Sequence, residues 1–150
     1  MTEITAIGPP MPGMCEPKTK RKGPTPEQVV QKAILKYLSL CRIGKVTRNN
    51  VGMVWTGGRP GSGRPVRFGT VGQADLTVEI HDSPMCIHIE VKAPGGKTTP
   101  AQDAWLEAQR KRGHLCLVAT SVDQVAEALT AAGFDVPRPV GRKGAERAND

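Results

Sequence analysis

Two neighbouring segments of this chain alternate apolar and polar residues, and their patterns match when the chain folds back between them. Residues 75–81 read Asp-Leu-Thr-Val-Glu-Ile-His and residues 86–92 read Cys-Ile-His-Ile-Glu-Val-Lys, which is the two-residue period of half-buried strands. A turn at Asp82 and Ser83 would pair the apolar side chains on one face: Leu76 with Ile89, Val78 with Ile87, and Ile80 with Met85. A slip of one residue would turn every apolar side chain to the other face, so the pattern predicts a single antiparallel register.

The same register brings charged side chains together at the open end of the hairpin. Asp75 lies opposite Glu90, and directly opposed residues of an antiparallel pair have Cβ atoms about 5 Å apart. Lys92 is two residues beyond Glu90 and shares its face. Two adjacent carboxylates repel each other unless a cation lies between them, and Mg²⁺ suits this position because it binds one or two carboxylates and keeps several waters. The cluster is therefore a candidate metal site; a solvated hairpin face with an ordinary Glu and Lys has similar weight from spacing alone.

A divalent ion at this position would suit hydrolysis of a phosphodiester. It would polarise a phosphoryl oxygen and lower the pKa of a bound water. The ammonium of Lys92 would orient or help to deprotonate that water and would offset charge that develops on the phosphate. The candidate chemistry is thus metal-dependent hydrolysis with Asp75, Glu90 and Lys92 as its centre.

Asp75, then Glu90-Val91-Lys92, then Gln102 resembles the PD-(D/E)XK nuclease superfamily and, within it, the VRR-NUC family. The Glu-x-Lys triplet is common, whereas its combination with a Gln ten residues after Lys92 is much more specific. Ala74 departs from the pattern, because the superfamily's name expects Pro there, but that Pro carries no chemistry. The resemblance covers about residues 25 to 130 and is carried by Gly69, Gly72, Asp75-Leu76, Ile89 to Lys92, Thr99 to Gln102, Gly113 and the segment Leu115 to Ala119.

The resemblance implies roles for further residues. Gln102 would belong to the active site, Glu27 would add a carboxylate near the metals, and the backbone carbonyl of Val91 would be a metal ligand beside Asp75 and Glu90. Without the resemblance, Gln102 is explained as a capping-box partner and Glu27 as an acidic residue favoured by the helix macrodipole. The implied activity is that of a Mg²⁺- or Mn²⁺-dependent endodeoxyribonuclease. Small stand-alone members of the family, typical of phages, look like homodimers that cut branched DNA such as four-way (Holliday) junctions.

The remaining patterns predict one α/β domain over residues 25–136 with the element order αβββαβα. This order matches the restriction-endonuclease-like core of the resembled superfamily, a mixed central sheet flanked by helices. Its last strand should run parallel to the second strand of the hairpin, because a helix connects them. Before the hairpin we expect a helix that begins at the cap Thr25 and is ended by Gly44, a strand over 46–55 and a flexible loop over 56–69. After the hairpin we expect a helix that begins at the cap Thr99 and is ended by Gly113, a continuously buried strand over 115–119, and a helix that begins at Ser121 and is ended by Gly133. The helix that begins at Thr99 should turn its apolar residues inward: Ala104, Trp105, Leu106 and Ala108.

The chain carries a net charge of +7, and its basic residues are clustered. Such clusters attract a polyphosphate backbone without reading sequence. Arg59, Arg64 and Arg67 precede Asp75 in a Gly-rich segment and are candidate DNA contacts, and Lys97 is a further candidate before the second helix. The basic segments 1–24 and 137–150 lack periodicity and are expected to be disordered, solvated tails.

Other functional classes are less well supported. No apolar run approaches the ~20 residues of a membrane helix, so we expect a cytoplasmic protein without membrane contact, in the host cytoplasm if phage-encoded. Gly96-Lys97-Thr98 resembles the end of a phosphate-binding P-loop, but Val91 stands where that motif needs a Gly, so no nucleotide cofactor is expected. The open alternatives to a nuclease are a non-catalytic nucleic-acid-binding module, which would have no reason to cluster Asp75, Glu90 and Lys92, and a nucleotide-binding protein.

Overall fold

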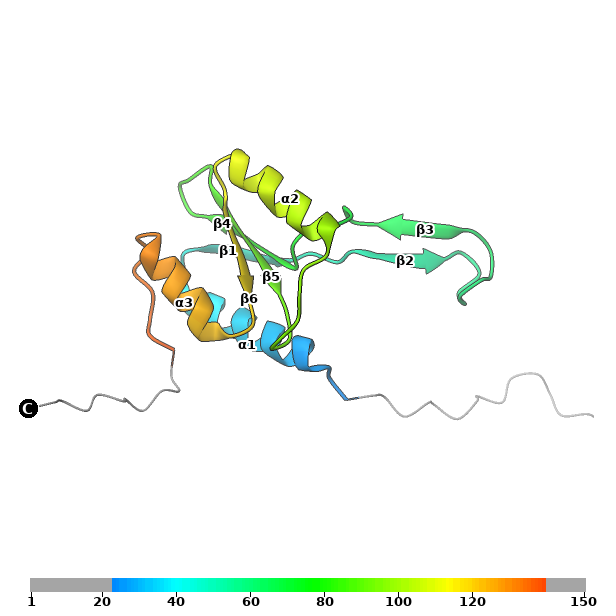
Figure 1. The fold of residues 1–150 in the computed structure, drawn as a ribbon, viewed down its shortest axis with the longest axis horizontal. Coiled ribbons are helices and arrows are strands. Elements are labelled where there is room, and N and C mark those ends of the chain that lie inside the picture. The colour runs from blue at the N-terminus through cyan, green and yellow to red at the C-terminus, as the bar shows by residue number, and fades with distance from the viewer. Residues whose placement is uncertain (1–22, 140–150) are drawn as a thin grey trace, which may run out of the picture.

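The computed structural model describes residues 23–139, and the expected disorder of residues 1–22 and 140–150 lies outside the described part. Within it the chain is a mixed α/β protein (Figure 1). The elements are α1 (Pro26–Cys41), β1 (Gly44–Arg48), β2 (Gly52–Trp55), β3 (Pro65–Phe68), β4 (Leu76–Ile80), β5 (Cys86–Val91), α2 (Pro100–Lys111), β6 (Leu115–Ala119) and α3 (Val122–Ala131).

The main sheet has four strands in the order β1-β4-β5-β6. The β4–β5 hairpin has the predicted register, with Leu76 opposite Ile89 and Val78 opposite Ile87. β6 runs parallel to β5, as the connecting helix α2 predicted. The sheet is therefore mixed, and the elements apart from β2 and β3 follow the order αβββαβα.

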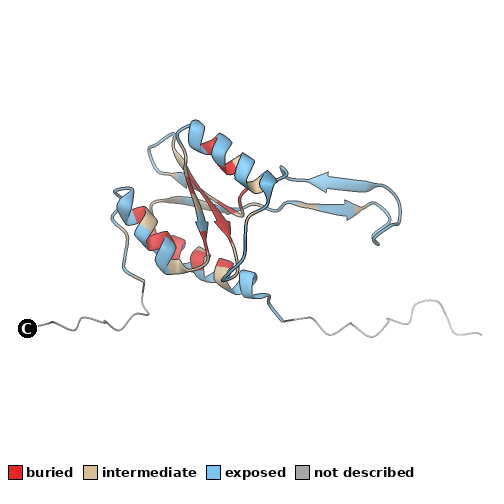
Figure 2. Ribbon diagram, viewed as in Figure 1, coloured by how far each residue is buried: buried red, intermediate tan, exposed pale blue. Residues whose placement is uncertain are grey.

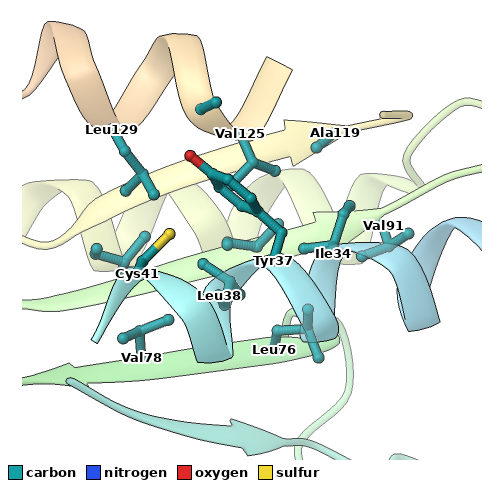
Figure 3. Packing of buried hydrophobic residues seen from close by; sticks show 13 residues of the cluster. Ile34, Tyr37, Leu38, Cys41, Leu76, Val78, Val91, Ala119, Val125 and Leu129 are labelled. Atoms are coloured by element: carbon teal, nitrogen blue, oxygen red, sulfur yellow. The ribbon is translucent and has the colours of Figure 1, made fainter. Parts of the chain in front are cut away.

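Helices cover both faces of this sheet. α1 and α3 pack on one face, where Figure 3 shows Ile34 and Leu38 of α1 against Leu76 and Val78 of β4. α2 lies on the opposite face, where Leu106 packs with Ala74 and Cys116. Burial of aliphatic surface on both faces supplies the main stabilisation of the fold.

The central strand β5 is buried on both of its faces (Figure 2). Ile87, Ile89 and Val91 point towards α1 and α3 and belong to the larger core. His88 and Glu90 alternate with them and are buried on the α2 side. The position of β5 thus encloses a carboxylate that alternation alone leaves at the surface.

All three predicted helix starts are confirmed. Thr25 and Thr99 form capping boxes with Gln28 and Gln102, and Ser121 accepts a hydrogen bond from the backbone N–H of Gln124. The predicted end of the first helix is wrong, because α1 stops at Cys41.

Arg42 and Gly44 explain the early end of α1. Arg42 adopts a left-handed conformation with φ of 53° and turns the chain. Gly44 instead begins β1, where a Cβ atom would collide with the carbonyl of Glu79 on the neighbouring strand. The role of Gly44 is therefore to let β1 and β4 approach closely, and it does not end the helix.

The strand predicted over 46–55 is two strands in different sheets. Asn49 marks the break: its N–H donates to the carbonyl of Asp75 at 2.7 Å, and its side-chain amide donates to the Ala74 carbonyl and the Thr77 hydroxyl, both at 2.9 Å. These bonds end β1 against β4, and the chain then leaves the sheet to form β2.

The predicted flexible loop 56–69 is also wrong, because it contains β3, which pairs with β2 as a separate two-stranded sheet. The two strands and their connection, residues 52–68, extend from the body as a projecting ribbon, here called the arm (Figure 1). The sequence pattern missed the arm because its strands are short and their apolar residues are exposed.

The face of α2 towards the sheet is partly polar. Leu106 and Gln109 are buried and Trp105 is partly buried, whereas Ala104 and Ala108 are exposed, against prediction. β6 differs too, because Val118 is 44% exposed rather than buried. Apolar periodicity does not reveal this helix face, because glutamine side chains form part of its contact with the sheet.

The ordered fold continues slightly beyond the predicted boundary at residue 136. Phe134 and Val136 pack on the larger core, and the Tyr37 hydroxyl donates to the carbonyl of Pro137 at 2.8 Å. None of the helices within residues 23–139 has the length and apolar character needed to cross a bilayer.

Candidate active site

Glu90 is the centre of the predicted cluster, and its side chain is only 1% exposed. Its Oε1 atom lies 2.8 Å from the Lys92 ammonium and accepts a hydrogen bond from the Gln102 amide at 2.5 Å. Its Oε2 atom is buried and accepts no hydrogen bond from the described residues. A buried carboxylate oxygen without a partner is costly, so this atom has an unmet need for a donor or a cation.

Asp75 approaches the same point from the end of β4. Its Oδ2 atom accepts a hydrogen bond from the backbone N–H of Val91 at 2.9 Å, which ties it to the strand that carries Glu90. The bond between the Asn49 N–H and the Asp75 carbonyl holds the main chain of Asp75 from the other side. The position of Asp75 is therefore set by two strands, β1 and β5, rather than by the hairpin turn alone.

Gln102 caps helix α2 and also contacts Glu90. Its Oε1 atom accepts a hydrogen bond from the Thr99 N–H at 2.9 Å and completes the capping box of α2. Its amide nitrogen donates to Glu90 at the same time. The cap orients the side chain, so that helix α2 delivers a fixed donor to the buried carboxylate.

Lys92 lies at the edge of this cluster, with its side chain 12% exposed. Burial alone would lower the pKa of the Lys92 ammonium, but the bond to Glu90 and the negative charges of Glu90, Glu27 and Asp75 outweigh it, so its pKa is raised. In the absence of a metal, Lys92 is therefore a cation that balances the carboxylates.

The pKa of Glu90 is raised above its usual value. Burial is the main cause, the bond from Lys92 acts against it, and the negative charges of Asp75 and Glu27 raise the pKa further. Glu27 is exposed in the first turn of α1, and its negative charge raises the pKa of both Glu90 and Lys92. A bound cation would reverse the balance and favour the ionised form of Glu90.

A cleft of about 450 Å³ opens beside Asp75 and Gln102. Sequence reasoning missed several of its polar residues, among them Arg48 at the end of β1 and the buried Gln31 of α1. A signal was present: residues 44–74 contain five basic residues and no acidic one. The lining residues are Gln31, Arg48, Asn49, Asn50, Val51, Phe68, Gly72, Gln73, Asp75 and Gln102.

Gly72 allows the cleft wall and α2 to meet closely. It has a φ of 80°, and a Cβ atom there would collide with the carbonyl of Ala101 in the first turn of α2. Ala74, which stands at the position of the superfamily's Pro, is fully buried against Leu106. Both small residues keep the segment before Asp75 close to the helix that carries Gln102.

The residues present fit a hard divalent cation. The available ligands are oxygen atoms of Asp75 and Glu90, and Mg²⁺ or Mn²⁺ prefers such ligands. Within residues 23–139 no group of three or more His, Cys, Asp and Glu side chains is placed to hold a metal ion. An ion at this site would therefore complete its shell from water, a main-chain oxygen and the substrate. The carbonyl of Val91 as a ligand stays a prediction, since the contact of Val91 with Asp75 is through its N–H.

The predicted DNA contacts do not lie together. Arg59, Arg64 and Arg67 are exposed on the arm rather than in the cleft beside Asp75. Lys97 is exposed in the turn before α2. The P-loop-like residues 96–98 are followed by Pro100 at the first position of α2, and Pro100 has no N–H that could bind a phosphate.

Mg²⁺ or Mn²⁺ is expected to raise the melting temperature of the wild-type protein, and Glu90→Gln should remove most of that rise. A ligand that binds only the folded state stabilises it by about 1.4 kcal/mol at about ten times its Kd. Each kcal/mol corresponds to roughly 4 °C in a domain of between 100 and 150 residues. Thermal unfolding with metal and with chelator measures the effect, and Glu79→Gln, an exposed change on the same hairpin, should keep the full rise. Equal rises in wild type and Glu90→Gln would place the metal elsewhere.

Comparisons with protein-family models, with curated proteins and with solved structures find no match to this chain.

Proposed function

We propose that this protein is a metal-dependent endonuclease that hydrolyses phosphodiester bonds in DNA. The observation that carries the proposal is the buried carboxylate of Glu90, which is bound by Lys92 and Gln102 and retains one unpartnered oxygen, while Asp75 is bound to the main chain of the adjacent residue Val91. A solvated hairpin face would not enclose a carboxylate in this way. The αβββαβα order supports the resemblance to the PD-(D/E)XK superfamily and its VRR-NUC family, and the restriction-endonuclease-like core is part of this proposal.

The residues of the site divide the work of such a reaction. Asp75 and Glu90, with the carbonyl of Val91, would hold Mg²⁺ or Mn²⁺, which supplies charge to polarise the phosphate and acidify water. Gln102 fixes the orientation of the Glu90 carboxylate. Lys92 would position the attacking water and offset charge on the phosphate, and Glu27 would add negative charge at the perimeter. The cluster is preorganised, because each of its polar contacts is tied to a strand or a helix cap.

The surface around the site favours a polyanionic substrate. The segment that lines the cleft and forms the arm carries Lys45, Arg48, Arg59, Arg64 and Arg67 without an acidic residue. Such a field attracts nucleic acid without reading its sequence. A non-catalytic binding module would explain this charge, but it would not explain a buried carboxylate that is bound by Gln102, a residue of the cleft wall, and whose other oxygen has no partner among the described residues.

Cleavage of labelled DNA tests the proposal directly. The purified protein is incubated with duplex, flap and four-way-junction DNAs in Mg²⁺, in Mn²⁺ and with chelator, and the products are separated on denaturing gels. We expect metal-dependent cuts within strands, with the rate ranking the substrates. Binding without cleavage of any substrate would favour the non-catalytic module, and ATP binding in a titration would favour a nucleotide-binding protein.

The substrate form and the assembly follow from the resemblance, and we propose a branched substrate cut by a homodimer. A two-fold pair of active sites suits paired cuts on a symmetric junction, because one small domain presents too little surface to span both arms of the junction. Light scattering at micromolar concentration should give about twice the 16.0 kDa chain mass. An excess of Asp75→Asn protein mixed with wild type should give heterodimers that nick a junction without resolving it. A monomeric mass with full resolution would contradict the dimer.

A further inference from the structure

The arm carries positive charge and apolar side chains away from the cleft. Its strands pair antiparallel, with Gly52 opposite Phe68 and Trp55 opposite Pro65. It stands outside the main sheet and is exposed along most of its length (Figure 2). An isolated two-stranded ribbon is marginally stable in water, so a projecting arm of this kind needs a reason.

The connection at the end of the arm is closed by main-chain hydrogen bonds. The strand ladder continues through bonds from Thr56 N–H to the Arg64 carbonyl and from Gly57 N–H to the Ser62 carbonyl, both at 3.0 Å. The tip is a turn over residues 59–62, in which Ser62 N–H bonds to the Arg59 carbonyl at 3.0 Å and Gly61 has a φ of 81°. The main-chain hydrogen bonds of the arm therefore continue from its strands to the end that carries Arg59 and Arg64.

The arm begins at the wall of the cleft. Val51 and Phe68 at its base line the same cleft as Asp75. From Gly52 to Gly57 the ribbon extends about 17 Å at ~3.4 Å per residue. At ~3.4 Å per base pair this length corresponds to about five base pairs of a DNA duplex. A duplex with a phosphate in the cleft would thus reach the tip of the arm some five base pairs away.

The side chains of the arm match the chemistry of a duplex. Arg59, Arg64 and Arg67 are exposed, and none has a carboxylate partner within the described part of the chain. Arginine contacts phosphates, apolar side chains contact base edges, and the major groove admits a two-stranded ribbon. The exposed apolar residues of the arm are Met53, Val54, Val66 and Phe68.

A second copy of the arm is a poorer partner. In a two-fold interface the same patch meets itself, so the arginines of one arm would face those of the other. The arm has no acidic residue that would relieve this repulsion. Charge complementarity therefore favours a polyanion over self-association through the arm.

We infer that the arm binds duplex DNA alongside the cleaved bond and lengthens the DNA site by about five base pairs. The inference rests on the proposed function, because it takes the cleft as the place of the scissile phosphate. The arm would act as a second grip that orients the duplex before cleavage. Its contribution is to affinity and reach, and it holds no residue that acts on the phosphodiester.

Binding measurements in an Asp75→Asn background test this inference apart from catalysis. Replacement of Arg59, Arg64 and Arg67 by Ala should weaken binding to a fluorescent duplex of about 24 base pairs at least tenfold, measured by anisotropy. The slope of log K against log salt should become shallower by about 0.9 for each lost phosphate contact. The control triple Lys36→Ala, Lys111→Ala, Arg112→Ala removes the same charge from exposed positions outside the arm and should change both quantities much less. Equal losses in the two triples would reduce the effect to net charge and overturn the inference.

An armless variant tests the reach. Replacement of residues 53–67 by Asn-Gly closes the chain between the paired Gly52 and Phe68 with a favourable two-residue turn. The number of base pairs covered per protein, from titration of long duplexes, should fall by about five. Circular dichroism and the unfolding midpoint check that the main sheet is intact. An unchanged number of covered base pairs would overturn the inference. A change of mass in light scattering without a change in DNA binding would also overturn it and would identify the arm as an assembly surface.

Failure of the arm inference and failure of the proposed nuclease give different results in these experiments. Loss of binding in the arm variants without any wild-type cleavage would leave the arm as a DNA contact and remove the proposed enzyme. Cleavage by the wild type together with unaltered DNA binding by the arm variants would support the proposed enzyme and remove the arm as a DNA contact.

Discussion

Asp75→Asn and Glu90→Gln are each expected to lower the rate of metal-dependent DNA cleavage about a thousandfold. Both changes keep the size of the side chain but remove the charge that would hold the metal. Metal polarisation supplies several kcal/mol of transition-state stabilisation, and about 1.4 kcal/mol corresponds to each tenfold change in rate. Lys92→Ala should have a similar effect, because it removes the ammonium bound to Glu90 at 2.8 Å. Single-turnover cleavage of a labelled DNA measures the rates.

The hairpin offers matched controls for these variants. Glu79→Gln on β4 and Asp82→Asn in the turn make the same chemical changes at exposed positions. Both should cleave at the wild-type rate. All three site variants should bind DNA with nearly wild-type affinity, because the basic residues of the cleft and the arm are unchanged. Full activity in either carboxylate variant would remove the assigned site.

Leu38→Ala is expected to lower the free energy of unfolding by about 2–5 kcal/mol. Leu38 is 1% exposed and lies in the core between α1 and the sheet (Figure 3). Its truncation removes buried apolar surface and leaves a cavity that the surrounding strands can fill only in part. The loss is large against the roughly 5–15 kcal/mol that stabilise a typical domain. Urea unfolding at 25 °C measures the difference.

Leu40→Ala is the control for this prediction. Leu40 lies two positions further along the same helix and is 63% exposed. Its truncation should change the free energy of unfolding by no more than about 0.5 kcal/mol. Equal effects of the two changes would mean that α1 does not pack on the sheet through Leu38.

Local pattern predicted much of the fold correctly. The hairpin register follows from alternation, because a shift of one residue would expose every apolar side chain of β4 and β5. The three helix starts follow from caps whose hydrogen bonds involve residues three apart. Features of this kind depend on neighbours in sequence, and a single sequence therefore suffices to predict them.

The errors occur where distant segments compete for the same residues. The segment 46–55 has the pattern of one strand, but Asn49 bonds to Asp75 and Ala74, some 25 residues away, and ends β1 there. The sheet side of α2 was predicted as apolar, but the glutamines Gln102 and Gln109 lie on it, and Gln102 donates a hydrogen bond to Glu90 of the sheet. Apolar periodicity contains no information on a polar group that is buried by a partner from elsewhere in the chain.

The hairpin register and strand alternation are enough to assign Asp75, Glu90 and Lys92 to one face of the sheet. The burial, the hydrogen bonds and the pKa shifts of the cluster depend instead on long-range packing. β6 and α2 enclose Glu90, the cap of α2 aims Gln102 at it, and β1 holds Asp75 beside it. The cleft likewise arises from the packing of segments far apart in the chain. The physical reason is that alternation assigns a side chain to a face, whereas its burial, its pKa and its unmet hydrogen-bonding capacity depend on what other segments place over that face.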